Sequence, residues 1–312
     1  MATLLEHTVM PSGGDYTTLD AALDHLVASH AGLVVADKYA EIKIDGTWSS
    51  ADTAAATISG LTTDATHYVK IYTTAAARHK GIWSTSYYML NVANSIAVTW
   101  TSVSNVWIDG LQIGKSATNA HYQDGIQGAG TVTATTNQFL VSNCIFKHSA
   151  NDSYREMALD AEVANQRIFM YNNIDYNHGT AANAYNCSAF VGNGALTCYS
   201  DTFIGGYQGI NNDSGTSAVV KNCYASGSNA AYSGCTLTTS ASNDATGSAA
   251  ALRNILVSTT ADSTHAGFTN ITAATADYHI KVGSPLIGVG TDTSGDAAPM
   301  NFSTDIDGQA RT

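Results

Sequence analysis

Several common features are scarce in this chain of 312 residues. It contains 3 prolines, its charged residues make up only 12%, and its 13 Lys and Arg face 25 Asp and Glu. The resulting net charge of −12 argues against a nucleic-acid partner, because phosphate binding depends on clustered basic side chains. The same charge would repel an anionic polysaccharide unless a cation bridged the two.

Long apolar runs are also missing. No window holds eighteen consecutive apolar residues, so we expect neither a membrane-spanning helix nor membrane insertion. The first residues, MATLLEHTVMPSGG, have no basic stretch followed by an apolar core, so we expect no signal peptide. An extracellular or virion location would then require another route out of the cell, such as lysis, unless a leader was removed.

The residues that are present favour β structure. Hydrophobic residues make up 44% of the chain, too many for a disordered protein, and the abundance of Ala, Thr, Ser, Gly and Asn is untypical of a helical one. This composition suits stacked strands joined by small-residue turns. The cysteines are odd in number and have no familiar pairing pattern, so we interpret most of them as small core residues. They are Cys144, Cys187, Cys198, Cys223 and Cys235.

A weak repeat runs through the middle of the chain. Six similar segments place a polar residue or glycine between two apolar stretches, and these central residues recur every 21 to 33 positions. They are Gly110, Asn143, Asn172, Asp201, Asn222 and Asn254. Repeats of this length built from short strands predict a solenoid in which each coil stacks about 4.8 Å above the last.

The central residue of each repeat is expected at a bend between two strands. Asn, Asp and Gly adopt the left-handed backbone conformation at low cost, and stacked side-chain amides can hydrogen-bond along a ladder. In the segment VWIDGLQIG, the dipeptide Asp109-Gly110 is therefore predicted to be a coil corner rather than a reactive carboxylate.

With this repeat, the chain resembles right-handed parallel β-helix proteins of the pectin-lyase-like superfamily, in particular a phage and environmental subgroup. The opening PSGGDYTTLDAALDHL, the stretch HYVKIYTTAAARHKGIWSTSYYMLNV and the closing SPLIGVGTD and DIDGQAR carry the likeness. The resemblance implies an all-β, right-handed parallel β-helix (solenoid) with a short N-terminal capping helix. It says little about activity, because one fold serves many functions.

The ends of the chain fit this architecture. In TTLDAALDHLVA the apolar residues recur at helical spacing, and Thr17 with Asp20 forms a predicted capping box. Such a helix would cover the open end of the stack; a partner-binding helix is the alternative. We expect an N-terminal strand and helix over 1–35, the β-helix over 36–290 and a closing segment over 291–312, all in one structural domain.

The segment 147–167 has seven charged residues in 21 positions. A charged excursion beside one coil would form the wall of a groove, and paired carboxylates near a guanidinium are the groups that glycoside hydrolysis uses. A solvated loop face is the plainer interpretation, with ligand binding and catalysis as alternatives. The candidates for catalysis are Asp152, Arg155, Glu156, Asp160 and His178.

Aromatic and polar residues recur in coils expected to lie next to this segment. Rings can cover the apolar faces of a sugar while polar groups bind its edges, although each Tyr fits strand packing at least as well. The predicted substrate-binding residues are Lys147, His148, Tyr154, Tyr171, Tyr176, His178 and Tyr199.

Motifs of polysaccharide-degrading enzymes are incomplete. NVWIDG is similar to a pectate lyase motif whose Asp helps bind calcium, and Asp109 would take that place, but Gly110 follows where the lyases have His. The Asp-Asp pair and the Gly-His-Gly of polygalacturonases are missing. The acidic C-terminal loops with Asp305 and Asp307 can also hold Ca²⁺, with a plain terminal turn as the alternative.

These observations lead to three hypotheses. The preferred one is a β-helix that recognises a polysaccharide or cell-surface glycan as a phage or virion component. The second is a polysaccharide lyase or glycoside hydrolase acting in the same groove, and the third is a structural or adhesive stalk. The resemblance to viral spikes also implies assembly as a homotrimer.

Overall fold

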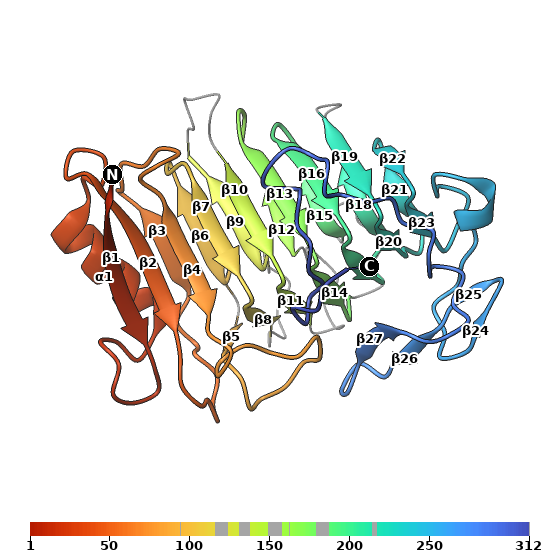
Figure 1. The fold of residues 1–312 in the computed structure, drawn as a ribbon, viewed down its shortest axis with the longest axis horizontal. Helices are drawn as coiled ribbons and strands as arrows, with labels where there is room; N and C mark the ends of the chain where they lie inside the picture. Colours follow the sequence, from red (N-terminus) through yellow and green to blue (C-terminus); the bar gives the residue numbers. More distant parts are fainter. Residues whose placement is uncertain are drawn as a thin grey trace.

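The computed structural model describes residues 1–93, 95–115, 124–130, 138–148, 158–161, 163–178, 187–213 and 217–311. It confirms a parallel β-helix: short strands return in the same order in successive coils from β4 onward, and the stack forms three parallel sheets, A, B and C (Figure 1). Within the described ranges, no helix is long and apolar enough to span a membrane.

The three sheets run along the stack, and each coil from β4 to β21 contributes one strand to each of them. Sheet A contains β1 (Thr3–Val9), β2 (Lys38–Ile44), β4 (Val69–Thr73), β7 (Val106–Asp109), β10 (Phe139–Ser142), β13 (Arg167–Tyr171), β16 (Ala195–Tyr199), β19 (Ala218–Lys221) and β22 (Thr236–Thr238). Sheet B contains β5 (Met89–Val92), β8 (Gln112–Lys115), β11 (Ile145–Lys147), β14 (Ile174–Tyr176), β17 (Thr202–Ile204), β20 (Tyr224–Ala225) and β23 (Ala241–Ser242). Sheet C contains β3 (Ala56–Ser59), β6 (Val98–Thr101), β9 (Ile126–Ala129), β12 (Leu159–Ala161), β15 (Cys187–Val191), β18 (Gln208–Asn212) and β21 (Ala230–Ser233).

Strand alternation separates an apolar interior from an outer face. Successive side chains of a strand point to opposite faces, so each sheet turns one set inward, and the register aligns these sets from coil to coil. One inward row of sheet A consists of Ile71, Ile108, Val141, Met170, Cys198, Val220 and Leu237. The buried core is therefore a continuous column along the helix axis. No disulfide joins the five cysteines, and four of them are buried.

The corner between sheets A and B confirms the predicted ladder. Gly110, Asn143, Asn172 and Asn222 all have positive φ, between 53° and 80°. Asn143 Nδ2 donates to Asp109 Oδ1 at 2.7 Å, and Asn172 Nδ2 donates to Asn143 Oδ1 at 3.2 Å. The amides thus bond along the stack as well as allowing the bend.

Two residues of the predicted corner series, Asp201 and Asn254, do not form corners. In the coil after Asn172 the left-handed residue is Ser200 (φ 58°), and Asp201 follows it and points into the core. In the last coil the corner is Thr239 (φ 46°), whereas Asn254 lies beyond β23, outside the stack.

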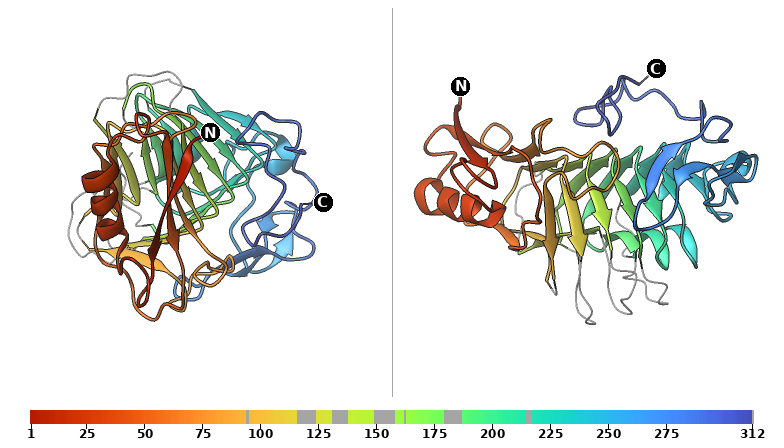
Figure 2. Two further views of the ribbon diagram at one scale, coloured as in Figure 1. Left: turned by 60° about the vertical axis from the view of Figure 1, so that its left-hand side comes forward. Right: turned by 90° about the horizontal axis from the view of Figure 1, so that it is seen from below.

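The N-terminal helix α1 (Leu19–His30) follows β1 and precedes β2 in the sequence, and it packs against β3, β2 and β1 (Figure 2). Its buried residues Leu19, Leu23 and Leu26 join the core cluster. The N-cap is Thr18, whose hydroxyl accepts from Ala21 N at 3.3 Å. The predicted capping box of Thr17 and Asp20 is therefore wrong: the cap lies one residue later, and Ala21 has no side chain that could bond back.

The stacked coils end at β23, well before residue 290. The chain then forms a short 3₁₀ helix, η1 (Ala250–Leu252), and two antiparallel pairs, β24 (Ala261–Asp262) with β25 (His265–Ala266) and β26 (Phe268–Asn270) with β27 (Asp277–Ile280). From there the C-terminal segment runs back across the front of β19, β16 and β13 (Figure 1).

Candidate functional site

The outer face of sheet A carries aromatic side chains in its first coils. Tyr39, Tyr68, Lys70, Tyr72 and Trp107 are outward-facing and half-buried, and we call them the aromatic strip. The alternation in KYAEIKI, YVKIYT and VWID turns them to the face opposite the inward alanine, valines and isoleucines.

Ring and ammonium contacts organise the strip. The Lys70 ammonium lies 4.1 Å from the ring centroid of Trp107 and 4.8 Å from that of Tyr72. The rings of Tyr39 and Tyr68 lie 5.1 Å apart. Burial, with the nearby Glu41 and Glu6 carboxylates, raises the pKa of Tyr72. Its phenol is protonated at neutral pH, as that of any tyrosine is, and Glu41 is its hydrogen-bond partner. The strip thus combines flat apolar faces with a cation and hydroxyl groups.

Asp109 is bound within the corner next to this strip. Its carboxylate forms an ion pair with Arg78 and accepts from Ser142 Oγ at 2.9 Å and from Asn143 Nδ2 at 2.7 Å. A side chain at Gly110 would collide with Arg78, so the arginine lies directly on the corner. Asp109 therefore stabilises the corner and already has a cationic partner.

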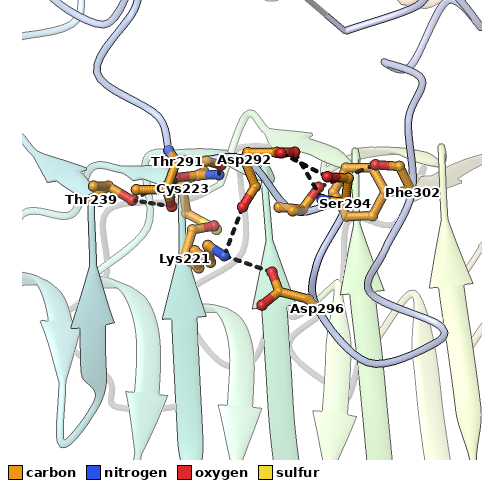
Figure 3. A network of polar contacts seen from close by, with 10 residues as sticks. Lys221, Cys223, Thr239, Thr291, Asp292, Ser294, Asp296 and Phe302 are labelled. Carbon is orange, nitrogen blue, oxygen red and sulfur yellow. Dashed lines mark hydrogen bonds and ion pairs between the residues drawn. The ribbon is translucent and has the colours of Figure 1, made fainter.

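The C-terminal segment covers the other half of sheet A. Lys221 Nζ forms an ion pair with Asp296 at 2.5 Å and donates to Asp292 O at 3.2 Å (Figure 3). Further along, Phe302 stacks on Tyr171 with ring centroids 4.4 Å apart. A cavity of about 970 Å³ lies between this segment, β27 and the corner residues.

Three of the predicted substrate-binding tyrosines, Tyr171, Tyr176 and Tyr199, pack against C-terminal elements. Tyr171 is covered by Phe302, and Tyr199 packs against the same cluster and lies beneath Lys221. Tyr176 is 1% exposed and contacts Tyr278 of β27, with ring centroids 5.2 Å apart. A sugar could reach Tyr171 or Tyr176 only after the C-terminal elements moved away.

The other described candidates divide between surface and interior. Lys147 is partly exposed and lies 5.4 Å from the ring centroid of Trp83. His148 and His178 are buried, and each contacts one carboxylate oxygen of Asp175. Asp160 is fully buried and accepts from Gln127 Nε2 at 2.7 Å. The predicted candidates Asp152, Tyr154, Arg155 and Glu156 lie outside the described residues.

The predicted calcium ligands in the C-terminal loops fulfil local roles. Asp305 Oδ1 accepts from the backbone N–H groups of Asp307 and Gln309 at 3.0 and 2.8 Å, which closes a tight turn. Asp307 Oδ2 lies 2.7 Å from His279 Nε2. In the parts of the chain that the structure describes, side chains able to hold a metal gather at two places, and neither includes Asp109, Asp305 or Asp307.

The sequence analysis missed two features: the aromatic strip, and the buried contact of Asp175 with His148 and His178. The alternation of Lys70 and Tyr72 with inward residues was a readable signal for the strip. Asp175 is not among the predicted site residues, because its inward direction depends on the register of β14 with Phe146 and Phe203.

The fold places the protein in the class of parallel β-helices. Comparison of the chain with protein-family models, with curated proteins and with solved structures found no match. The geometry of the strip itself is compatible with stacking against a flat, hydroxyl-rich ligand.

Proposed function

We propose that the protein recognises a polysaccharide or cell-surface glycan through the aromatic strip. The observation that supports this most directly is the Lys70 ammonium, which lies over the rings of both Tyr72 and Trp107 on a half-buried sheet face. Aromatic rings on rigid strands can cover the apolar faces of successive sugars, while the ammonium and phenol groups bind hydroxyl or carboxylate edges. The strip lies on the half of sheet A that the C-terminal segment leaves open.

The resemblance to pectin-lyase-like phage and environmental proteins supports a virion or extracellular setting for this role. We propose that the protein belongs to that superfamily and acts as a virion-associated receptor-binding or structural component. A homotrimer is part of the same proposal, and the mass from light scattering tests it independently of the sugar.

Binding to a panel of neutral and uronate oligosaccharides tests the proposal. Trp107→Ala and Tyr72→Ala should each weaken binding by about tenfold or more, because an aromatic contact of this kind contributes on the order of 1–2 kcal/mol. Tyr207→Ala, a half-buried Tyr between β17 and β18, is the matched control and should bind normally. Absence of binding across the panel would overturn the proposal and favour a stalk.

Turnover separates recognition from catalysis. The same incubations should yield neither new reducing ends nor unsaturated products. If products appeared, the protein would be a glycoside hydrolase or polysaccharide lyase, and Arg155→Ala and Glu156→Ala would then show whether the charged segment 147–167 carries the reaction.

A further inference from the structure

Two histidines and one aspartate meet inside the β-helix. His148 follows β11, Asp175 lies in β14 and His178 lies two residues beyond β14. His148 Nε2 is 3.0 Å from Asp175 Oδ1, and His178 Nε2 is 2.6 Å from Asp175 Oδ2. The side chains of all three are at most 1% exposed. Their ligating atoms all lie within 4.8 Å of one another.

The backbone directs these side chains to one point. In β14, Ile174 and Tyr176 face outward toward the C-terminal hairpin, so Asp175 faces inward, between Phe146 and Phe203 of the neighbouring coils. Asn177 has φ 67°, and this left-handed residue turns His178 back toward Asp175.

The neighbouring coil contributes the second histidine through backbone hydrogen bonds. His148 N donates to Tyr176 O at 3.1 Å, and Asn177 Nδ2 donates to His148 O at 2.5 Å. The two imidazoles consequently stack, with ring centroids 4.0 Å apart and an interplanar angle of 27°. Two adjacent coils therefore hold the three side chains in place.

The hydrogen bonds do not account for this arrangement. Neither ring nitrogen of His148 makes a hydrogen bond of acceptable geometry with the part of the chain described here, although Nε2 lies close to Asp175. Asp175 Oδ1 is likewise buried without a hydrogen bond of acceptable geometry to the described chain. Buried polar atoms without partners are costly and rare in folded proteins.

We propose that His148, Asp175 and His178 bind a divalent transition-metal ion of the Zn²⁺ type, which fastens two adjacent coils from inside. Two imidazoles and one carboxylate form a common ligand set for Zn²⁺ and related ions, whereas Ca²⁺ and Mg²⁺ prefer oxygen ligands alone. Ligands about 2.1 Å from a tetrahedral ion lie about 3.4 Å apart. The two contacts with Asp175, at 3.0 and 2.6 Å, would therefore lengthen by less than about 1 Å when the ion binds. The Ser188 hydroxyl, 3.4 Å from His178 Nε2, is a neutral group beside the cluster.

Metal content of the native protein tests the proposal. The full chain is produced in medium supplemented with Zn²⁺ or Co²⁺, purified through a tag without histidine, and analysed by mass spectrometry of the elements. We expect about one equivalent of metal per chain, and visible absorption bands for the Co²⁺ form. Wild-type protein with less than about 0.1 equivalent under both conditions would overturn the proposal.

Paired variants locate the ion. His148→Gln and His178→Gln should lose it, whereas His67→Gln, which alters a partly exposed histidine between Asp37 and Asp64, should keep it. Equal metal content in all three variants would place the ion elsewhere and overturn the proposal. If the buried variants fail to fold, wild-type protein decides: growth with a chelator should lower its melting temperature and abolish the Co²⁺ bands, and no change in either would also overturn it.

Discussion

Asp175 and Asp201 lie in adjacent coils, and both carboxylates are buried inside the β-helix. The side chains that they contact differ. Asp175 contacts both stacked imidazoles, His148 through Oδ1 and His178 through Oδ2. Asp201 lies among thiols and an amide: its Oδ1 accepts from Asn173 N and Nδ2, and its Oδ2 accepts from Cys198 Sγ at 2.9 Å. Both residues are at most 1% exposed.

The partners decide the charge of each carboxylate. Burial alone would raise the pKa of Asp175, but attraction to His178 and His148 outweighs it and brings the pKa well below the usual value. At Asp201 burial prevails over the hydrogen bonds from Cys198 and Asn173 and raises the pKa to about 7. Equal burial therefore permits a charged carboxylate beside two imidazoles and favours a neutral one beside thiols and an amide.

Asp175→Asn should have the largest effect. The substitution removes the negative charge that faces two buried imidazoles, and breaking a buried pair in this way costs about 3 kcal/mol or more. We expect the free energy of unfolding at pH 7 to fall by about that amount in guanidinium titrations. An unchanged midpoint would mean that the histidines are neutral and satisfied without the carboxylate.

Asp201→Asn should act in the opposite direction at high pH. The folded pKa of Asp201, about 7, exceeds the reference value of 3.8, so the folded state binds more protons between these pH values and wild-type stability falls as pH rises through them. The amide removes this cost, and we expect a gain of about 2 kcal/mol at pH 8 and little change at pH 4. Unfolding curves at both pH values check this; a loss at pH 8 would contradict it.

Cys198→Ala should produce a smaller loss. It deletes the S–H group that donates to Asp201 and leaves a small gap next to Cys223, whose Sγ is 3.6 Å from Cys198 Sγ. We expect a decrease in unfolding free energy of about 1–2 kcal/mol at pH 6. In the double variant with Asp201→Asn the loss should shrink, and full additivity would show that the two groups do not interact.

His67→Gln should leave stability unchanged within error. Like His148 and His178, His67 contacts carboxylates, at 2.8 Å from Asp64 and 3.1 Å from Asp37, but these partners are exposed. Solvent screens such contacts. A loss comparable to that of Asp175→Asn would show that burial is not what separates the two kinds of site.

Much of the fold could be predicted from the sequence because its corners have a strong local preference. Asn143, Asn172 and Asn222 are residues that favour the left-handed conformation, and their spacing gave the coil length. Ser200 and Thr239 occupy the same corners without that preference, held by the coils on either side, so no local signal marked them.

The candidate sites were predicted less well, because their environment comes from distant parts of the chain. His148 and His178 were expected beside a surface groove, but the register of β11 and β14 directs them inward against Asp175. Tyr171 and Tyr176 do face outward, yet Phe302 and Tyr278, more than a hundred positions later, cover them. Neither the register nor the return of the C-terminal segment has a signature in the local pattern.

The returning C-terminal segment also changes how the molecule would respond to mechanical force. Arg311 donates to Asn172 Oδ1, and Asn172 Nδ2 donates to Thr304 O at 2.7 Å, while Asp296 contacts Lys221. Solenoids normally fray from their ends, since each repeat contacts only its neighbours. Here tension applied at the C-terminus would be transmitted first to the middle of the stack, and the last coil would be shielded until those contacts ruptured.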